Sequence, residues 1–271
     1  MRSASGLFEI GVRTYVNRSE QNDEAMAQNI YDDPAFFSGY SRLPRQTDGL
    51  AAAPEWPVLR AMLPPLAGRR VVDLGCGFGW FARFAREQGA ASVLGIDVSE
   101  NMIAQARRDT DDDRIVYRVA DLETLDLPEA SFDLAYSSLA FHYVADFARL
   151  ADALANALVP GGDLVFSIEH PIFMAAANPR WIDDGGRKTW PVNDYAREGE
   201  RRTDWFVQGV LKHHRRLSTT LNVLISAGFT VRQIEEFAPN PAQIANDPAL
   251  EVELERPMFL LVSARRMRVP R

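Results

Sequence analysis

One stretch of the chain, VVDLGCGFGW at residues 71–80, restricts the fold more than any other. It opens with a short apolar run, which is typical of a strand covered on both faces of a sheet. Glycines at positions 75, 77 and 79 then let the backbone turn tightly and leave no side chain between the chain and a ligand. From Trp80 onward, apolar residues recur at helical spacing. The stretch therefore predicts a strand, a turn and a helix, with a ligand held against free N–H groups where the helix begins.

The composition is that of an ordinary globular protein, and it argues against several classes of partner. The 271 residues suffice for one α/β domain with an insertion. The formal net charge of −7 provides no global basic field, so we expect neither nucleic acid nor a membrane as partner. The single cysteine, Cys76, allows no intramolecular disulfide, and a cytoplasmic protein is expected. Residues 1–22 lack periodicity and are expected to form an N-terminal extension that need not be ordered, while 23–271 form one domain.

Apolar strands alternate with amphipathic helices along most of the chain. After the strand in 71–74, further strands are expected at 92–97, 115–119, 132–138, 164–169, 229–237 and 258–264. Helices are expected at 56–63, from 80 to a stop at Gly89, at 100–108, at 144–158 before a break at 160–162, and from a cap at Ser218 to Gly228 with Ile225 buried. This alternation predicts a doubly wound, mostly parallel sheet of seven strands with helices on both faces. An aromatic N-terminal flap at 30–45 and an insertion at 171–216, after the fifth strand, interrupt the pattern.

Two carboxylates follow the ends of neighbouring expected strands. Asp97 ends the second strand, and a carboxylate there can accept two hydrogen bonds from ribose hydroxyls. Asp121 follows the third strand, where it would lie beside an adenine. Taken alone, either residue is equally well explained as a polar residue of a surface turn. Ligands of such sheets bind beyond the carboxyl ends of the strands, and both residues lie there.

Together these features resemble the class I S-adenosylmethionine (SAM)-dependent methyltransferases of the small-molecule type. The resemblance rests on D-x-G-x-G-x-G from Asp73, on Asp97 and Asp121, on FDL at 132–134, on LVPGG at 158–162 and on AGF at 227–229. It covers about two thirds of the chain, and the order of the motifs makes it more specific than any one of them. It implies a Rossmann-like fold, SAM as cofactor and transfer of a methyl group.

The family pattern also implies which residues hold SAM. The methionine portion falls to Asp73 and the loop that follows, the ribose to Asp97, the adenine to Asp121 and Leu122, and the sulfur end to Ser138. Residues of the N-terminal flap, Tyr40 and Arg45 among them, would close over the cofactor. The complete expected set is Tyr40, Arg45, Asp73, Gly75, Cys76, Gly77, Gly79, Asp97, Val98, Met102, Asp121, Leu122 and Ser138. Cys76 serves only as a small side chain of the loop, and we assign no metal site.

Three residues near the carboxyl edge of the sheet are candidate general bases. A hydroxyl or amine acceptor must lose a proton on methylation, and His142, Glu169 and His170 are placed to take it. The alternative is that His142 caps or packs its helix. Glu169 and His170 are equally explained as a structural ion pair.

The insertion at 171–216 is expected to select the acceptor. Its large aromatic side chains are too numerous for a plain solvent loop. We expect Trp181, Trp205, His214 and Arg215 to contact a small-molecule acceptor. The alternative is that the same segment forms an interface between copies, so the protein is expected to be a monomer or a homodimer.

The expected function is methyl transfer from SAM to an oxygen or nitrogen of a small molecule by in-line displacement. One alternative is a NAD(P)-dependent oxidoreductase of related fold, although the third glycine comes one residue early for the dinucleotide fingerprint. Another is a SAM-binding module without catalysis. A nucleic-acid methyltransferase is disfavoured by the acidic charge balance.

Overall fold

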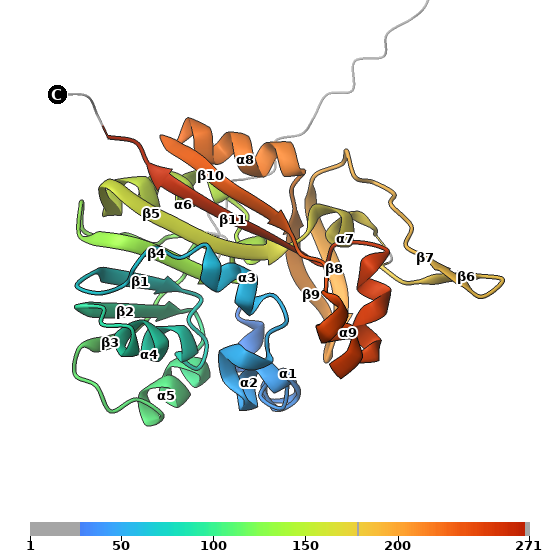
Figure 1. The fold of residues 1–271 in the computed structure, drawn as a ribbon, viewed down its shortest axis with the longest axis horizontal. Helices are drawn as coiled ribbons and strands as arrows, with labels where there is room; N and C mark the ends of the chain where they lie inside the picture. The colour runs from blue at the N-terminus through green and yellow to red at the C-terminus, as the bar shows by residue number, and fades with distance from the viewer. Residues whose placement is uncertain (1–27, 178, 269–271) are drawn as a thin grey trace, which may run out of the picture.

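A seven-stranded sheet forms the centre of the molecule. The computed structural model describes residues 28–177 and 179–268, and the strand order is β10-β11-β5-β4-β1-β2-β3 (Figure 1). The strands are β1 (Arg70–Leu74), β2 (Ser92–Asp97), β3 (Ile115–Val119), β4 (Phe132–Ser138), β5 (Leu158–Glu169), β10 (Phe229–Glu236) and β11 (Phe259–Arg266). Neighbouring strands from β3 to β5 run parallel, whereas β11 runs antiparallel to both β5 and β10. This confirms the expected doubly wound, mostly parallel sheet.

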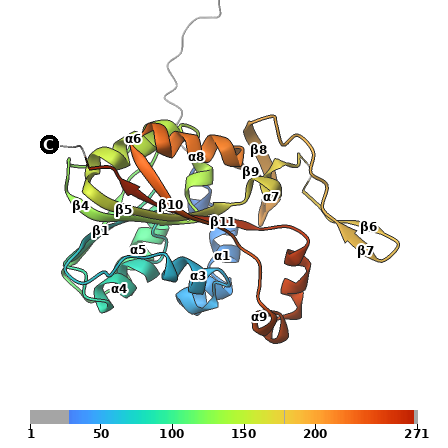
Figure 2. The ribbon, with the colours of Figure 1, turned by 45° about the horizontal axis from the view of Figure 1, so that its top comes forward.

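Helices cover both faces of the sheet. Figures 1 and 2 agree that one face carries α3 (Trp56–Ala61), α4 (Trp80–Glu87) and α5 (Glu100–Arg108), and the other carries α6 (Phe147–Ala157) and α8 (Leu217–Ser226). The side chains of β1 alternate accordingly. Val71 packs in the core on the α4 side, and Val72 and Leu74 pack in the core on the α6 side. A period of two residues thus gives one strand two buried faces.

The expected flap and insertion are both separate from the sheet. The N-terminal segment contains η1 (Ile30–Asp32), α1 (Pro34–Tyr40), α2 (Pro44–Thr47) and η2 (Gly49–Ala52). The insertion contains α7 (Pro171–Ala175) and two hairpins, β6 (Ile182–Asp184) with β7 (Arg187–Thr189) and β8 (Gly199–Trp205) with β9 (Val207–His214). The two segments meet, because Phe36 of α1 lies edge-on to Trp205 of β8 with ring centroids 5.3 Å apart.

A further pair of helical turns was not predicted from the sequence. Between β10 and β11 the chain forms α9 (Pro241–Asn246) and η4 (Pro248–Leu254). Asn240 and Gln243 form a reciprocal capping box at the start of α9, with a proline at its first turn. The capping box and the proline are sequence signals that could have revealed this helix.

Some expected element ends were wrong. Helix α6 begins at Phe147 rather than Val144, because the side chain of Asp146 accepts from the N–H of Arg149 at 2.9 Å and caps the helix there. The break expected at 160–162 lies inside β5, which begins directly after α6. Helix α8 begins at Leu217 rather than after a cap at Ser218. Ile225 is 55% exposed, because Leu224 and Thr220 occupy the buried face of α8 instead.

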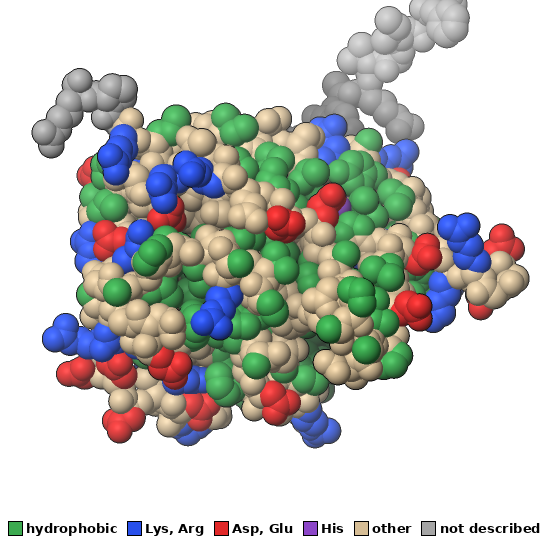
Figure 3. Space-filling model, viewed as in Figure 1, with side chains coloured by type: hydrophobic (Ala, Val, Ile, Leu, Met, Phe, Trp, Pro, Cys, Tyr) green, Lys and Arg blue, Asp and Glu red, His purple; other side chains and the backbone are tan. Residues whose placement is uncertain are grey.

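The surface of one face is shown in Figure 3. Hydrophobic side chains gather over its middle, and most charged side chains lie near its margin, where acidic and basic groups are interspersed. Within the described ranges, every helix is too short or too polar to cross a bilayer.

Candidate active site

The glycine loop between β1 and α4 is shaped by its contacts. The N–H groups of Gly75 and Cys76 both donate to the carbonyl of Ile96, at 2.8 and 2.9 Å, which ties the loop to the end of β2. Gly75 and Gly77 have φ values of +71° and +52°, a region that favours glycine. A Cβ at Gly75 would lie 2.3 Å from the Cβ of Ala140, whereas one at Gly77 would meet nothing within 4 Å. Gly75 therefore permits close packing, and Gly77 leaves space open for a ligand.

Gly79 packs closely against Tyr117. It precedes α4 with φ +75°, and a Cβ there would lie 2.1 Å from the hydroxyl of Tyr117. Gly79 is outside the lining of the cavities described below, so its contribution is to packing and to the start of the helix. Cys76 is buried, and burial, followed by the charges of Asp73 and Asp97, raises the pKa of its thiol well above the usual range. This disfavours a nucleophilic thiolate.

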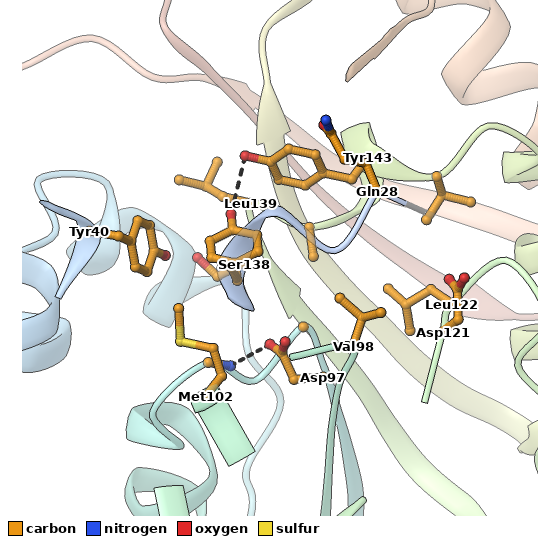
Figure 4. Close-up of a pocket in the computed structure, with 15 residues that line it drawn as sticks. Gln28, Tyr40, Asp97, Val98, Met102, Asp121, Leu122, Ser138, Leu139 and Tyr143 are labelled. Carbon is orange, nitrogen blue, oxygen red and sulfur yellow. Dashed lines mark hydrogen bonds between the residues drawn. The ribbon is translucent and has the colours of Figure 1, made fainter. Parts of the chain in front are cut away.

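The first cavity lies beyond the carboxyl ends of β1, β2 and β4 (Figure 4). It contains about 680 Å³ of space, part of it open to solvent. Of the residues expected to bind the cofactor, it brings together Tyr40, Gly75, Gly77, Asp97, Val98, Met102, Asp121, Leu122 and Ser138. The lining also includes Gln28, Tyr31, Leu139, Ala140, Tyr143 and Val144, which were not singled out from the sequence.

The carboxylate of Asp97 is fixed at the edge of the first cavity. Its Oδ2 accepts from the N–H of Gly77 at 2.9 Å, and its Oδ1 accepts from the N–H of Ser99 at 3.0 Å. Burial raises its pKa to about 6, with a further increase from Asp32, while the backbone donors oppose the shift. Because each oxygen retains acceptor capacity, the carboxylate can still receive hydroxyl donors. Asp121 lines the same cavity, and its Oδ1 accepts from the N–H of Glu123 at 2.9 Å.

The second cavity contains a buried carboxylate and a guanidinium. Asp73 and Arg45 both line it, together with Cys76, Tyr40 and Ser138. Asp73 is 2% exposed, and its Oδ2 has no hydrogen-bond partner among the described residues. Burial, with a smaller effect from Asp97, raises its pKa to about 8, while the N–H of Ala82 opposes the shift.

The lining of the second cavity holds one cation, Arg45, and two buried anions, Asp73 and Glu55; Arg45 and Asp73 are complementary to an amino-acid zwitterion. The guanidinium of Arg45 contacts the carboxylate of Glu55 at 2.6 Å, and the open oxygen of Asp73 can receive an ammonium group. The residues present therefore suit the methionine portion of SAM, which the sequence resemblance implies.

The third cavity is the largest of the three, with about 1200 Å³ of space. It is bounded by the N-terminal segment, the insertion and the ends of β5 and β11. Its lining contains the ring side chains Tyr31, Tyr40, Tyr143, Phe173, Trp190, Trp205 and Phe259 and the polar side chains Arg45, His142, Glu169, Thr203, Asp204 and Lys212. Tyr40 borders all three cavities, so they adjoin one another around this side chain.

Polar groups on one wall of the third cavity are linked to each other. Lys212 Nζ contacts Glu169 Oε1 at 2.5 Å, and both side chains are largely buried. The backbone N–H of Glu169 donates to Nδ1 of His142 at 3.4 Å. Burial, followed by the charges of Lys212 and Arg215, lowers the pKa of His142 well below its usual range. His142 is therefore a neutral imidazole at neutral pH.

His170 does not share this wall with Glu169. Its Nε2 contacts Glu236 Oε1 at 2.9 Å, and its Nδ1 accepts from the N–H of Ile172 at 3.0 Å, which caps α7. The reason is strand geometry, since successive side chains of an extended chain point to opposite sides. His170 thus lies outside the lining of the three cavities, and its partner is Glu236 rather than Glu169.

Three of the four residues expected to contact the acceptor also lie outside these linings. Trp181 packs against the guanidinium of Arg256, whose Cζ is 4.9 Å from the ring centroid. Nε2 of His214 lies 2.9 Å from the carbonyl oxygen of Tyr195. Arg215 donates to the carbonyls of Val144 and Phe141 at 2.7 and 2.6 Å. Only Trp205 of that set lines the third cavity.

Lys212, Tyr31 and Tyr143 were not singled out from the sequence as residues of the site. Tyr31 and Tyr143 join their hydroxyls at 3.1 Å across the first and third cavities. The density of aromatic residues in 30–45 was a signal for Tyr31. Lys212 lies between Val210 and His214 on the buried face of β9, a period-two pattern that could have identified it.

Comparison with known proteins assigns the family. Residues 72–166 match the family model for a methyltransferase domain. The crystal structure of an S-adenosylmethionine dependent methyltransferase from Mesorhizobium loti is 60% identical, with a TM-score of 0.78, over 80% of this chain and 100% of that one. An uncharacterized protein of Haemophilus influenzae is 34% identical over 252 residues, which are 88% of this chain and 97% of that protein.

Another relative matches over a shorter range. The malonyl-[acyl-carrier protein] O-methyltransferase of Enterobacter lignolyticus is 38% identical over 109 residues, 40% of this chain and 42% of that protein. The match therefore spans less than half of that relative. These similarities exclude the oxidoreductase alternative and favour an enzyme over a SAM-binding module. The chain belongs to the class I SAM-dependent methyltransferases, with SAM as its cofactor.

Proposed function

We propose that this methyltransferase methylates a hydroxyl or amine of a small molecule held in the third cavity. The observation that supports the proposal is a shared wall, since Tyr31, Tyr40, Leu139 and Tyr143 line both the first and the third cavity. In-line transfer requires donor and acceptor to be held close together in a fixed orientation. A cofactor cavity and a larger cavity with common side chains meet that requirement.

Each part of SAM has a proposed partner in the first two cavities. Asp97 accepts from the ribose hydroxyls, and Asp121 lies beside the adenine. Asp73 receives the ammonium group of the methionine portion, and Arg45 receives its carboxylate. The support for the last pair is the buried, open oxygen of Asp73 in a cavity that it shares with the guanidinium of Arg45.

Glu169 is the proposed proton acceptor. When bound, SAM supplies a methyl group on a positively charged sulfur that needs no further activation to leave. The chain must align the acceptor, exclude water and take up the proton that a hydroxyl or amine loses. Glu169 lines the third cavity, and its carboxylate is oriented by Lys212 Nζ at 2.5 Å.

His142 is proposed to orient the acceptor rather than to deprotonate it. Its lowered pKa makes it a poor base. Its Nδ1 already accepts from the N–H of Glu169, so the neutral ring carries its proton on Nε2. That N–H can donate to an acceptor oxygen in the third cavity. This assignment replaces the expectation that His142 is a general base.

Transfer of an isotopic methyl label tests the proposal. The protein is incubated with methyl-labelled SAM and a cell extract separated into a small-molecule fraction and a macromolecular fraction, and products are detected by mass spectrometry. The label should enter a small molecule at oxygen or nitrogen. Glu169→Gln should lower kcat on that product by about 10²- to 10⁴-fold, the usual contribution of a general base.

Matched controls make the outcome decisive. Glu200→Gln makes the same chemical change on β8, at a side chain that is 61% exposed, and should leave turnover unchanged. Label found only in the macromolecular fraction, or a protein that binds SAM and labels neither fraction, would contradict the proposal. A Glu169→Gln variant with normal kcat would remove Glu169 from the proton-transfer role.

A further inference from the structure

The buried charges of the third cavity are already matched by opposite charges of the protein. Lys212, which is 4% exposed, contacts Glu169 at 2.5 Å. Arg45 contacts Glu55 at 2.6 Å, and Glu55 is 1% exposed. The remaining charged residue of the lining, Asp204, is exposed and accepts from the N–H of Gly209 at 3.1 Å. A carboxylate or phosphate on the acceptor would therefore have to compete with Glu169 for Lys212, or with Glu55 and the proposed SAM carboxylate for Arg45, at a high cost in desolvation.

Four of the seven rings of the lining, Phe173, Trp190, Trp205 and Phe259, already lie near a protein cation. Arg256 places its Cζ 4.1 Å from the ring centroid of Trp190 and 4.4 Å from that of Phe173. Lys212 Nζ lies 5.5 Å from the ring centroid of Trp205. Rings that already hold a protein cation offer little to a second one, and the like charges repel each other. An ammonium-bearing acceptor is thus disfavoured by the same wall that disfavours an anion.

Rings from three parts of the sequence, namely the N-terminal segment, the segment after β4 and the insertion, make up much of the lining. Tyr40 of α1 lies edge-on to Trp205 of β8 at 5.7 Å between centroids, and Phe173 is stacked on Trp190 at 5.5 Å. Tyr31 and Tyr143 complete the side toward the first cavity. Flat faces and edges in this arrangement suit an aromatic ring, which gains from offset stacking and edge-to-face contact.

We propose that the acceptor is an uncharged aromatic alcohol or amine of the phenol or aniline type, bound between these rings with its polar group toward His142 and Glu169. This inference rests on the proposed function, because it concerns the acceptor of the same reaction. The internally paired charges reject ionic acceptors of both signs, and the rings supply the binding surface.

Three probes of one shape and different charge test the inference. These are 2-naphthol, 2-naphthoate and 2-naphthylmethylammonium, each titrated calorimetrically at neutral pH into the protein saturated with S-adenosylhomocysteine. The unmodified protein should bind 2-naphthol about tenfold or more tightly than either ion, since a buried unpaired charge costs at least one decade in affinity.

Removing one member of the buried pair should switch the preference. Glu169→Gln leaves Lys212 uncompensated and should raise affinity for 2-naphthoate about tenfold, and Lys212→Met should do the same for 2-naphthylmethylammonium. Affinity for 2-naphthol should not rise in either variant, because its hydroxyl loses a charged acceptor in Glu169→Gln and gains none in Lys212→Met. Glu200→Gln, on the exposed side of β8, should leave all three affinities unchanged.

Several results would overturn the inference without touching the proposed function. One is an ionic probe that binds the unmodified protein as tightly as 2-naphthol. Another is failure of all three probes to bind a protein that binds S-adenosylhomocysteine. A third is a labelled product from the extract experiment that carries a permanent charge or lacks an aromatic ring. Label found only in the macromolecular fraction, in contrast, would remove the proposed function itself.

Discussion

Asp73→Asn should remove a pH-dependent loss of stability while it weakens the binding of SAM. In the ligand-free state the Asp73 carboxylate is buried, and one of its oxygens lacks a partner among the described residues. Burial raises its pKa to about 8, against about 3.9 in an unfolded chain. The folded state therefore binds this proton more tightly than the unfolded state does. As the pH rises between these two values, the free energy of unfolding falls.

The magnitude follows from the pKa difference. Between about pH 5 and about pH 8 the folded protein holds a proton that the unfolded chain has lost. Each pH unit lowers the free energy of unfolding by about 1.4 kcal/mol, so the total loss over this range is at most about 4 kcal/mol. Relaxation of the protein around the buried carboxylate makes this loss smaller. From about pH 5 to about pH 8, the free energy of unfolding of the unmodified protein should therefore fall by about 2–4 kcal/mol more than that of Asp73→Asn. The amide adds a constant penalty of about 1–3 kcal/mol for its buried N–H donors, which cancels from the pH dependence.

Urea denaturation at several pH values, without cofactor, measures this slope. Asp133→Asn is the matched control. The pKa of Asp133 is lowered, first by its hydrogen bond with Arg70, so this carboxyl is ionised in both states across the range and should add no slope. Parallel pH profiles for the unmodified protein and Asp73→Asn would refute the reasoning.

Cofactor titration supplies the second half of the test. An ammonium group opposite Asp73 favours the ionised carboxylate, so SAM affinity of the unmodified protein should fall by up to about tenfold for each pH unit below the pKa of about 8. Asp73→Asn should bind SAM weakly with a flat profile. If both proteins bind SAM equally well, Asp73 does not hold the ammonium group.

Two other substitutions separate a ligand contact from a structural one. Asp97→Ala removes a charged acceptor of the ribose and should weaken SAM binding by about 10- to 150-fold, corresponding to about 1.5–3 kcal/mol; a loss below about threefold by calorimetry would exclude Asp97 as the ribose ligand. Arg215→Ala leaves the carbonyls of Phe141 and Val144 without their donor and should lower the free energy of unfolding by about 2–4 kcal/mol. Unchanged urea denaturation of that variant would show that these two hydrogen bonds contribute nothing.

The position of the cofactor side of the site could be predicted because each of its residues lies at, or just after, the end of one strand. Asp97 is the last residue of β2, and Gly77 follows the end of β1 by three positions. In a parallel sheet such positions meet at one edge whatever the rest of the chain does. Local sequence therefore sufficed to bring them together.

The acceptor side depends on contacts that local sequence does not determine. Glu169 and Lys212 are 43 residues apart, and they meet because the hairpin of β8 and β9 folds back over the end of β5. Trp181, expected to contact the acceptor, lies outside the lining of the third cavity for a similar reason. Its ring is occupied by Arg256, which comes from the segment before β11. A count of aromatic residues cannot distinguish a wall that faces a ligand from one that faces an internal cation.

The neighbours Glu169 and His170 differ in whether they line the third cavity, and the difference has a simple geometric cause. Glu169 and His170 were treated together as candidates for the same cavity. Because neighbouring side chains in extended backbone point to opposite sides, only one of them can line it. The same alternation separates Lys212, which lines the third cavity, from its neighbour His213.

The position of Tyr40 links two binding equilibria. Its ring borders the two cavities assigned to SAM and the one assigned to the acceptor. Any shift of the ring that favours one ligand also alters the space offered to the other. By thermodynamic reciprocity, the factor by which SAM changes acceptor affinity must equal the factor by which the acceptor changes SAM affinity. A substitution at Tyr40 should therefore change one coupling factor that both ligands share, as well as the strength with which each is held.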